Sequence, residues 1–384
     1  MKIPAAWNGT ALDGFRGRVR WRRPFHAPRA RGPDERLWLV FDGLDYFADV
    51  ALNGTPLGRH EGYFERFEFD ATSLVGPRNE LVVEVDCPAE ADDRARRLIR
   101  GWRGTGAVPH GGGIWAEVAL EVRSFAFLRD VKIRAELAGS RGVIITTGRV
   151  VGESAGPVGL DLTADQRPIA GTKIEASPAG AAFELRAELH DVELWWPRNL
   201  GLPRTYVVEV ELHGRARTLD ARRCRVGFRQ LHIEPAADWG ELNGRRLAVT
   251  PIDISELAAR LREPDLNDVA AKNLVAAVAP NCDGLSLGRV PGEVHGRRIY
   301  DLASTEGLLI WQDFPLAGNV TEAESFAAEA ARQARALIRQ LCHQPSVALW
   351  SPCADAPAAQ SAAATAVQRE FSQLDPSRPF VLPT

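Results

Sequence analysis

Residues 41–54 of the chain read FDGLDYFADVALNG, and this stretch predicts the fold of the first third of the molecule. Apolar and polar residues alternate over 46–52, which is the period of a β-strand with one buried face. The pair Asn53-Gly54 that follows is typical of a tight hairpin turn, because both residues tolerate a left-handed backbone. The segment 36–41 is also strand-like. We therefore expect antiparallel strands joined by short turns.

Further strand-like segments lie on both sides of this stretch. Residues 17–25 alternate between apolar and mostly arginine side chains, and segments 64–69 and 81–85 continue the pattern. Short strands of period two, separated by Gly and Pro, are typical of a β-sandwich or jelly roll. We expect one such unit over residues 1–123.

A second group of strand-like segments predicts an immunoglobulin-like β-sandwich over residues 124–235. Its expected strands are 131–137, 143–151, 159–162, 183–188, 206–212 and 224–233. The stretch 164–182 is rich in Ala, Gly and Pro, and we expect it to form the looser edge of this unit.

After residue 240 the apolar period changes, because strands now alternate with helices. Expected strands are 247–250, 284–287, 308–311, 347–350 and 380–382, and expected helices are 265–279, 300–305, 321–342 and 358–374. Thr321 and Glu324 have the spacing of a capping box. Such alternation predicts a parallel sheet. A closed (β/α)₈ barrel takes about 200–250 residues, so we expect an incomplete barrel over 236–384. The predicted fold class is multidomain β plus α/β: a jelly-roll-like sandwich, an immunoglobulin-like sandwich and an incomplete TIM-type barrel.

Composition and charge argue against several classes of function. The chain has 384 residues with 47 Lys and Arg against 50 Asp and Glu, a formal charge of -3. A protein that tracks nucleic-acid phosphates usually carries a positive excess, so we expect no nucleic-acid partner. The apolar runs are much shorter than the roughly 20 residues of a membrane span, so we expect no membrane partner.

The N-terminus has no apolar stretch typical of a secretion signal, and the five cysteines are scattered without a CxxC pair. Both features favour a cytoplasmic protein with reduced thiols. The eight histidines show no metal-ligand spacing, and no Gly-rich phosphate loop or nucleophile elbow is present. We expect neither a metal nor a cofactor.

Several motifs, taken in order, resemble glycoside hydrolase family 2 in its β-mannosidase-like branch. The motifs are residues 41–54, 58–64, 112–118, 194–197, 225–229, 308–314 and 345–350. The resemblance covers nearly the whole chain. It implies a sugar-binding-like sandwich, an immunoglobulin-like middle domain and a catalytic barrel.

The resemblance also implies site residues. A retaining glycosidase needs two carboxyl groups about 5–5.5 Å apart, one serving as acid/base and the other as nucleophile. Asp355 falls on the acid/base position of the family, where its side chain is one methylene shorter than the usual Glu. Asp313, Trp311, Trp350 and Asn281 fall on positions expected to bind the substrate.

The same comparison shows departures from the family pattern. Ala354 replaces the Asn before the acid/base residue, Ser286 replaces an Arg expected to reach into the cleft, and Gln344 replaces a His. The nucleophilic Glu of the family would lie beyond Thr384, so we expect the chain to be C-terminally truncated relative to the family and its active site to be degenerate.

Two interpretations of function follow. The first is a non-catalytic or catalytically impaired protein associated with carbohydrate, serving as a binding or assembly module. The alternative is an active or split β-glycosidase, similar to a β-mannosidase or β-galactosidase, that hydrolyses O-glycosidic bonds with Asp355 as acid/base. The substitutions at 354, 286 and 344 favour the first, because a partner chain that supplied missing strands would not restore these side chains.

An incomplete parallel sheet must cover its open edge at 380–382. We expect a homodimer or a complementing partner chain at that edge, unless the sheet packs on the immunoglobulin-like unit. In that case Trp195 and Trp196 would form an interdomain plug. We favour this interpretation over a sugar-stacking platform, because large aromatic side chains dominate buried interfaces. A carbohydrate is the expected ligand.

Overall fold

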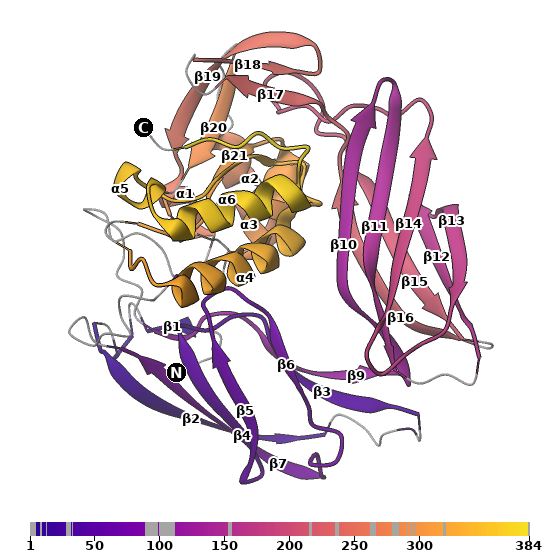
Figure 1. Ribbon diagram of the computed structural model, residues 1–384, viewed down its shortest axis with the longest axis vertical. Coiled ribbons are helices and arrows are strands. Elements are labelled where there is room, and N and C mark those ends of the chain that lie inside the picture. Colours follow the sequence, from indigo (N-terminus) through magenta and orange to yellow (C-terminus); the bar gives the residue numbers. More distant parts are fainter. Residues whose placement is uncertain are drawn as a thin grey trace.

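The computed structural model places the two groups of antiparallel strands and the later β/α elements as three neighbouring bodies (Figure 1). The structure describes residues 5–7, 10–12, 14–27, 32, 34–88, 99, 112–152, 156–214, 217–234, 238–261, 266–278, 284–289, 291–292, 294, 296–317 and 320–382. None of its helices in these ranges is long and apolar enough to cross a membrane.

The first body is a sandwich of two antiparallel sheets. One sheet has the order β2 (Gly17–His26), β7 (Arg78–Cys87), β4 (Phe47–Leu52) and β5 (Thr55–Glu61), and the other has β6 (Phe67–Asp70), β3 (Arg36–Phe41) and β9 (Val118–Arg123). A short pair, β1 (Ala5–Ala6) and β8 (Gly113–Ile114), lies beside them. Asn53 and Gly54 have φ values of 52° and 80°, which confirms the predicted tight turn. Strand β5 was not expected from the sequence.

The second body is also a sandwich, and its strands mostly match those expected. One sheet has the order β10 (Ala126–Ala138), β11 (Arg141–Gly152) and β14 (Ala181–Leu189), and the other has β13 (Arg167–Ile174), β12 (Val158–Ala164), β15 (Tyr206–His213) and β16 (Thr218–Val226). The stretch 164–182 lies at the edge of its sheet, as expected, but it contains a regular strand, β13. The strand expected over 224–233 needs correction, because β16 ends at Val226 and β17 (Leu231–Glu234) joins another sheet.

The third body is a six-stranded sheet in the order β17, β18 (Trp239–Leu242), β19 (Arg245–Asp253), β20 (Leu285–Arg289), β21 (Leu309–Asp313) and β22 (Val347–Ser351). The first three strands are antiparallel, and β19 to β22 are parallel, as the alternation of strands and helices predicts. A parallel bridge between Trp350 and Phe380 continues the sheet, so the last expected strand is reduced to a single contact.

Six helices accompany this sheet in the described ranges: α1 (Ser255–Arg260), α2 (Asp268–Val278), α3 (Arg297–Glu306), α4 (Glu324–Leu341), α5 (Ala356–Ala359) and α6 (Ala362–Leu374). The predicted capping box is wrong, because α4 starts after Ala323 without a side-chain cap and the Thr321 hydroxyl accepts a hydrogen bond from Ala323 N. The single helix expected over 358–374 is two helices, since the Ser361 side chain caps α6.

The two faces of the sheet pack against different parts of the chain. Its helix-covered face forms one large core with α1 to α6, which Tyr46 and Phe64 of the first sandwich join. On its other face, called here the inner face, apolar residues of β17 to β22 pack together and against Trp195. Trp195 is fully buried and its indole donates to the Ser304 carbonyl at 2.8 Å, so it is a plug between the second sandwich and the sheet, as its interdomain interpretation predicts.

Candidate active-site region

The parallel strands bring the candidate residues to one edge of the sheet. Arg289 ends β20, Asp313 ends β21 and Ser351 ends β22, with Asp355 four residues later. Because the carboxyl ends of parallel strands meet at the same edge, these side chains come from segments far apart in the sequence. This edge is where ligands bind in open α/β sheets.

Asp313 is the central group at this edge and is fully buried. Its Oδ2 atom accepts hydrogen bonds from Arg289 Nε and from the Gly292 backbone N–H, each at 3.0 Å. Arg289 Nη2 lies 2.9 Å from the same oxygen and also donates to the Ala354 carbonyl at 3.2 Å. Arg289 therefore ties together the ends of β20 and β21 and the loop after β22.

The electrostatic balance at Asp313 favours the protonated form more than in water. Burial raises its pKa from 3.8 to about 6, although the nearby Arg289 charge and the Gly292 N–H act in the opposite direction. Desolvation therefore outweighs the ion pair at this site. The Arg289 guanidinium also lies over the Trp311 ring, 4.4 Å from its centroid, so three of the side chains at this edge form one compact cluster.

Asp355 is half-buried and has a structural partner. Its Oδ1 atom accepts a hydrogen bond from the Ala358 backbone N–H at 3.0 Å, which makes it the N-cap of α5. The preceding residue, Ala354, is held by a hydrogen bond from its N–H to the Leu316 carbonyl at 2.8 Å. The segment expected to present an acid/base carboxyl therefore turns directly into a helix.

The structure brings together Asp313 and Trp311 of the expected site, and it places Trp350 elsewhere. The Trp350 side chain is fully buried on the helix-covered face, where its ring stacks on Phe371 at 4.8 Å and its indole donates to Asp375 at 3.0 Å. Asn281 lies outside the described residues.

The expected loss of a cation at Ser286 needs correction. Leu285 and Leu287 belong to the core of the inner face, so by strand alternation Ser286 points to the opposite face and Arg289 to the inner one. A cation is thus present, three residues later than the family pattern implied. The alternation within β20 is the sequence signal that would have identified it.

Gln344, which replaces a His of the family pattern, is buried in a polar network. Its side-chain carbonyl accepts from the Ser304 hydroxyl at 2.7 Å, and its amide donates to Asp301 at 2.6 Å. The Ser304 and Ser346 hydroxyl oxygens lie 2.9 Å apart, within hydrogen-bond distance. The network connects α3 to the start of β22, so this substitution has a structural role below the site.

Comparisons with known proteins agree with this architecture. The family model described as "Glycosyl hydrolase 2 galactose-binding domain-like" matches residues 16–118, and the model "Glycosyl hydrolases family 2" matches residues 126–229. Two β-sandwiches followed by a parallel β/α sheet define a multidomain class of β plus α/β proteins. The chain belongs to glycoside hydrolase family 2.

Its relatives are enzymes of several names. A β-glucuronidase of Bacteroides fragilis is 25% identical and matches 91% of this chain and 52% of its own length. A β-mannosidase B of Aspergillus terreus is 23% identical and matches 81% of this chain and 40% of its own length. The chain thus spans about half the length of these relatives.

The solved structures show the same fold. A putative β-galactosidase from Bacteroides fragilis superposes over 100% of this chain and 58% of its own, with a TM-score of 0.77 and 19% identity. A β-D-mannosidase from Dictyoglomus thermophilum superposes over 95% of this chain and 50% of its own, with a TM-score of 0.78 and 19% identity. No group of three metal-ligating side chains occurs within the part of the chain that the structure describes.

Proposed function

We propose that this chain is a carbohydrate-associated member of glycoside hydrolase family 2 in which hydrolysis of O-glycosidic bonds is impaired. The observation that carries the proposal is the use of Asp355 as the N-cap of α5, with Oδ1 bound to a backbone N–H. A general acid must hold a proton and reach the glycosidic oxygen. A carboxylate that caps a helix has one oxygen committed to that bond.

Two further features support impairment. The Asp355 side chain is shorter than the Glu that the resemblance implies, and a displacement of about 1 Å can cost roughly 100-fold in rate. Ala354 has no side-chain group that could hydrogen-bond a sugar hydroxyl. Asp313, the other carboxyl at this edge, is fully buried and bound by Arg289, so it meets a sugar only if that pair opens.

The test is hydrolysis of aryl β-glucuronides, β-mannosides and β-galactosides, chosen from the names of the relatives, by the purified chain. We expect no turnover above that of Asp355→Ala. Turnover by the wild-type chain that disappears in this variant would overturn the proposal. Asp355→Glu is the matched variant, because it restores the side-chain length and keeps the charge.

An active β-glycosidase is the second candidate, and the raised pKa of Asp313 is the observation that favours it. A carboxyl with a pKa of about 6 keeps its proton to a higher pH than a solvated Asp does, as a general acid requires. In that case turnover should fall as the pH rises through about 6, and Asp313→Asn should abolish it while Asp355→Ala leaves it unchanged.

Carbohydrate association is tested separately, by calorimetric titration of the full chain with methyl glycosides of the same three sugars. Binding without turnover is the expected result. Absence of both binding and turnover would refute the carbohydrate part of the proposal.

A further inference from the structure

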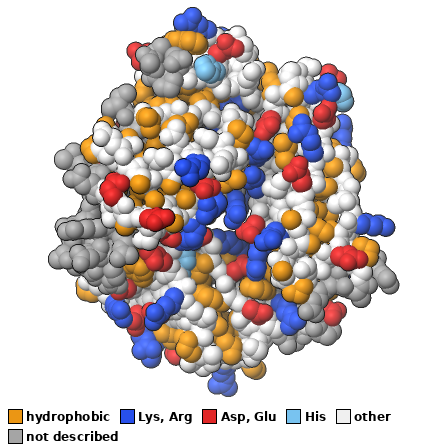
Figure 2. Space-filling model, viewed as in Figure 1, with side chains coloured by type: hydrophobic (Ala, Val, Ile, Leu, Met, Phe, Trp, Pro, Cys, Tyr) orange, Lys and Arg blue, Asp and Glu red, His pale blue; other side chains and the backbone are white. Residues whose placement is uncertain are grey.

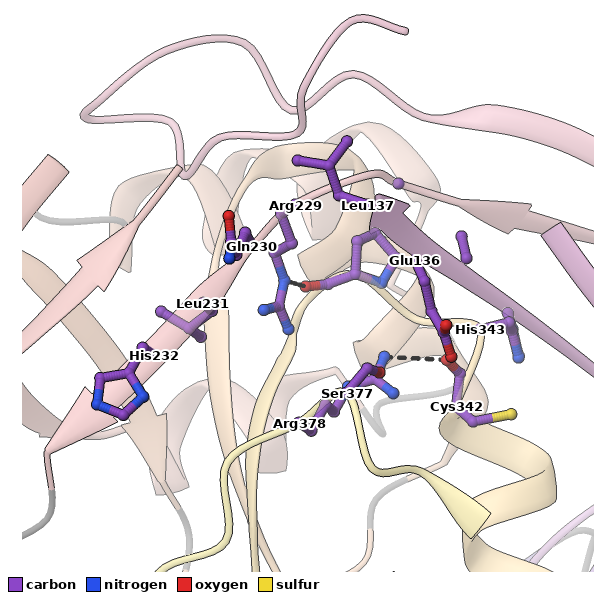
Figure 3. A pocket seen from close by; sticks show the side chains of 13 residues that line it. Glu136, Leu137, Arg229, Gln230, Leu231, His232, Cys342, His343, Ser377 and Arg378 are labelled. Carbon is purple, nitrogen blue, oxygen red and sulfur yellow. Dashed lines mark hydrogen bonds between the residues drawn. The ribbon is translucent and has the colours of Figure 1, made fainter. Parts of the chain in front are cut away.

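A cavity of about 340 Å³ lies between the second sandwich and the β/α body, away from the carboxyl edge of the sheet. It is lined by the end of β10, the segment after β16, the end of α4 and the loop after α6, and Figure 3 shows Arg229 and Arg378 converging on it from two of these segments. Gln230, His232 and Ser377 line the cavity and are exposed to solvent, so they form its mouth.

Arg229 is the cation in the cavity wall that has no carboxylate partner in the described part of the chain. Its Nε donates to the Pro345 carbonyl at 2.8 Å and its Nη2 to the Val347 carbonyl at 2.5 Å. Both acceptors are neutral, Nη1 donates to no residue that the structure describes, and within that part of the chain Arg229 forms no ion pair. A guanidinium without a carboxylate can serve an anionic ligand with its remaining N–H groups.

The neighbouring charges leave the cavity positive. Arg378 pairs with Asp375, whose same oxygen also accepts from Trp350, so this carboxylate is already used. Glu136 in the cavity wall lies 3.2 Å from Arg134.

Lys132 lies in the same strand as Glu136 but does not line the cavity, and in the described part of the chain its ammonium donates to the Leu374 carbonyl at 3.4 Å and pairs with no carboxylate. Among the residues that line the cavity, Arg229 and Arg378 are cations and Glu136 is a carboxylate, so the lining carries a positive excess. Figure 2 shows Lys and Arg side chains gathered in the hollow between the helices and the second sandwich.

Burial and a neighbouring cation change the pKa of Arg229. Burial and the charge of Arg378 lower the pKa of Arg229 to about 9. His343, also in the wall, is held neutral because burial lowers its pKa to about 3, so it does not add to the charge. An anion in the cavity would relieve the repulsion between the two guanidinium groups.

We propose that this cavity is a binding site for a small oxyanion, with Arg229 as the principal donor and Arg378 as the second cation. A volume of about 340 Å³ lies at the lower end of the usual range for ligand pockets and accommodates an inorganic phosphate or a hexose phosphate. The exposed mouth admits it from solvent. The site is separate from the carboxyl edge of the sheet, so the proposal does not depend on hydrolytic activity.

The experiment is calorimetric titration of the full chain with inorganic phosphate, with a hexose 6-phosphate and with the neutral hexose. Binding of both phosphates, with the neutral hexose inactive, is the expected result. Tighter binding of the hexose phosphate would identify a sugar phosphate as the ligand, and equal binding would identify the free anion. Equal binding of the neutral hexose, or no binding of either phosphate, would overturn the proposal.

Variants at the mouth avoid the structural contacts of Arg229. Gln230→Glu adds a negative charge at an exposed position of the cavity wall and should weaken phosphate binding about fivefold. Gln368→Glu makes the same change at an exposed position of α6 that does not line the cavity and should leave binding unchanged. Arg229→Lys keeps a charge but loses the fork of donors, and should weaken binding without abolishing it. Equal effects of the two Gln→Glu changes would show nonspecific electrostatics and refute the site.

Discussion

Replacement of Asp313 by asparagine should flatten the pH dependence of the free energy of unfolding. Asp313 is fully buried at the end of β21 and shares Oδ2 between Arg289 and the Gly292 N–H. Asparagine has nearly the same shape and can still accept a hydrogen bond from Gly292, but it cannot ionise. The variant therefore removes one titrating group and leaves the packing of the strand ends nearly unchanged.

The sign of the effect follows from the raised pKa. Below pH 3.8 the carboxyl is protonated in both the folded and the unfolded chain, so it makes no pH-dependent contribution. As the pH rises, the unfolded chain loses this proton first, and the folded chain then binds more protons than the unfolded one. Stability therefore falls until the pH passes the folded pKa of about 6. The total loss is on the order of 3 kcal/mol, of which about 2 kcal/mol falls between pH 4 and pH 7.

The assay is urea unfolding of the wild-type chain and of Asp313→Asn at several pH values from 4 to 7. Other carboxylates also contribute to the pH dependence, among them Glu68 and Glu121, whose pKa values their arginine partners lower despite burial. Because these groups are the same in both proteins, their effects cancel in the difference between the two free energies. That difference should change by about 2 kcal/mol in favour of the variant as the pH rises from 4 to 7.

The matched control is Asp238→Asn. Asp238 is exposed, and its side chain forms no hydrogen bond with any residue that the structure describes. Its difference from the wild-type chain should stay nearly constant over the same range. A constant difference for Asp313→Asn as well, or a change of the opposite sign, would refute the argument, because it would mean that Arg289 keeps Asp313 ionised more easily than water does.

Three further substitutions test the packing around the site. Trp195→Ala should lower the free energy of unfolding by about 3–5 kcal/mol in chemical denaturation, because a fully buried ring and its hydrogen bond to Ser304 are lost. Trp196 is only partly buried, so Trp196→Ala should lower the free energy of unfolding by less. Equal losses for the two variants would contradict the interpretation of Trp195 as a plug. Gln344→Ala should lower the free energy of unfolding by about 1–3 kcal/mol, because the buried Ser304 hydroxyl and Asp301 lose a partner. The control Gln368→Ala, on the exposed face of α6, should lower it by less than about 0.5 kcal/mol. Similar losses for the two variants would argue against the network. Gly54→Ala should lower the thermal midpoint of unfolding, because φ is +80° and an alanine there brings backbone strain of about 1 kcal/mol. No atom lies within 4 Å of an added Cβ, so steric contact adds nothing to this strain. Gly76→Ala is the control, because Gly76 does not have a left-handed backbone.

Several of the strands that the sequence predicted have one buried and one exposed face. In β14, for example, buried and exposed residues alternate from Phe183 to Glu188, so the pattern is visible in the residue types. Two of the missed strands, β5 and β13, lack this regular alternation, and no residue in either is fully buried. Both are edge strands of their sheets, held by backbone pairing to β4 and β12. Backbone hydrogen bonds are available to any sequence, so residue types alone do not indicate them.

The position of Trp350 shows why motif positions alone could not locate the site. Ile310 pairs with Val347 and Trp311 pairs with Leu349, so Ala348 is an extra residue that forms a β-bulge in β22. Ala348 and Leu349 consequently both pack on the inner face.

A bulge of one residue exchanges the faces of all residues that follow it. In a regular strand that begins with Val347 on the helix-covered face, Trp350 would point to the inner face, beside Trp311. The bulge turns it to the helix-covered face instead, against Phe371. The inner face at the carboxyl edge thus keeps Arg289, Asp313 and Trp311 as a closed cluster, so a sugar that entered there would have to displace Arg289 before it met the Asp313 carboxylate.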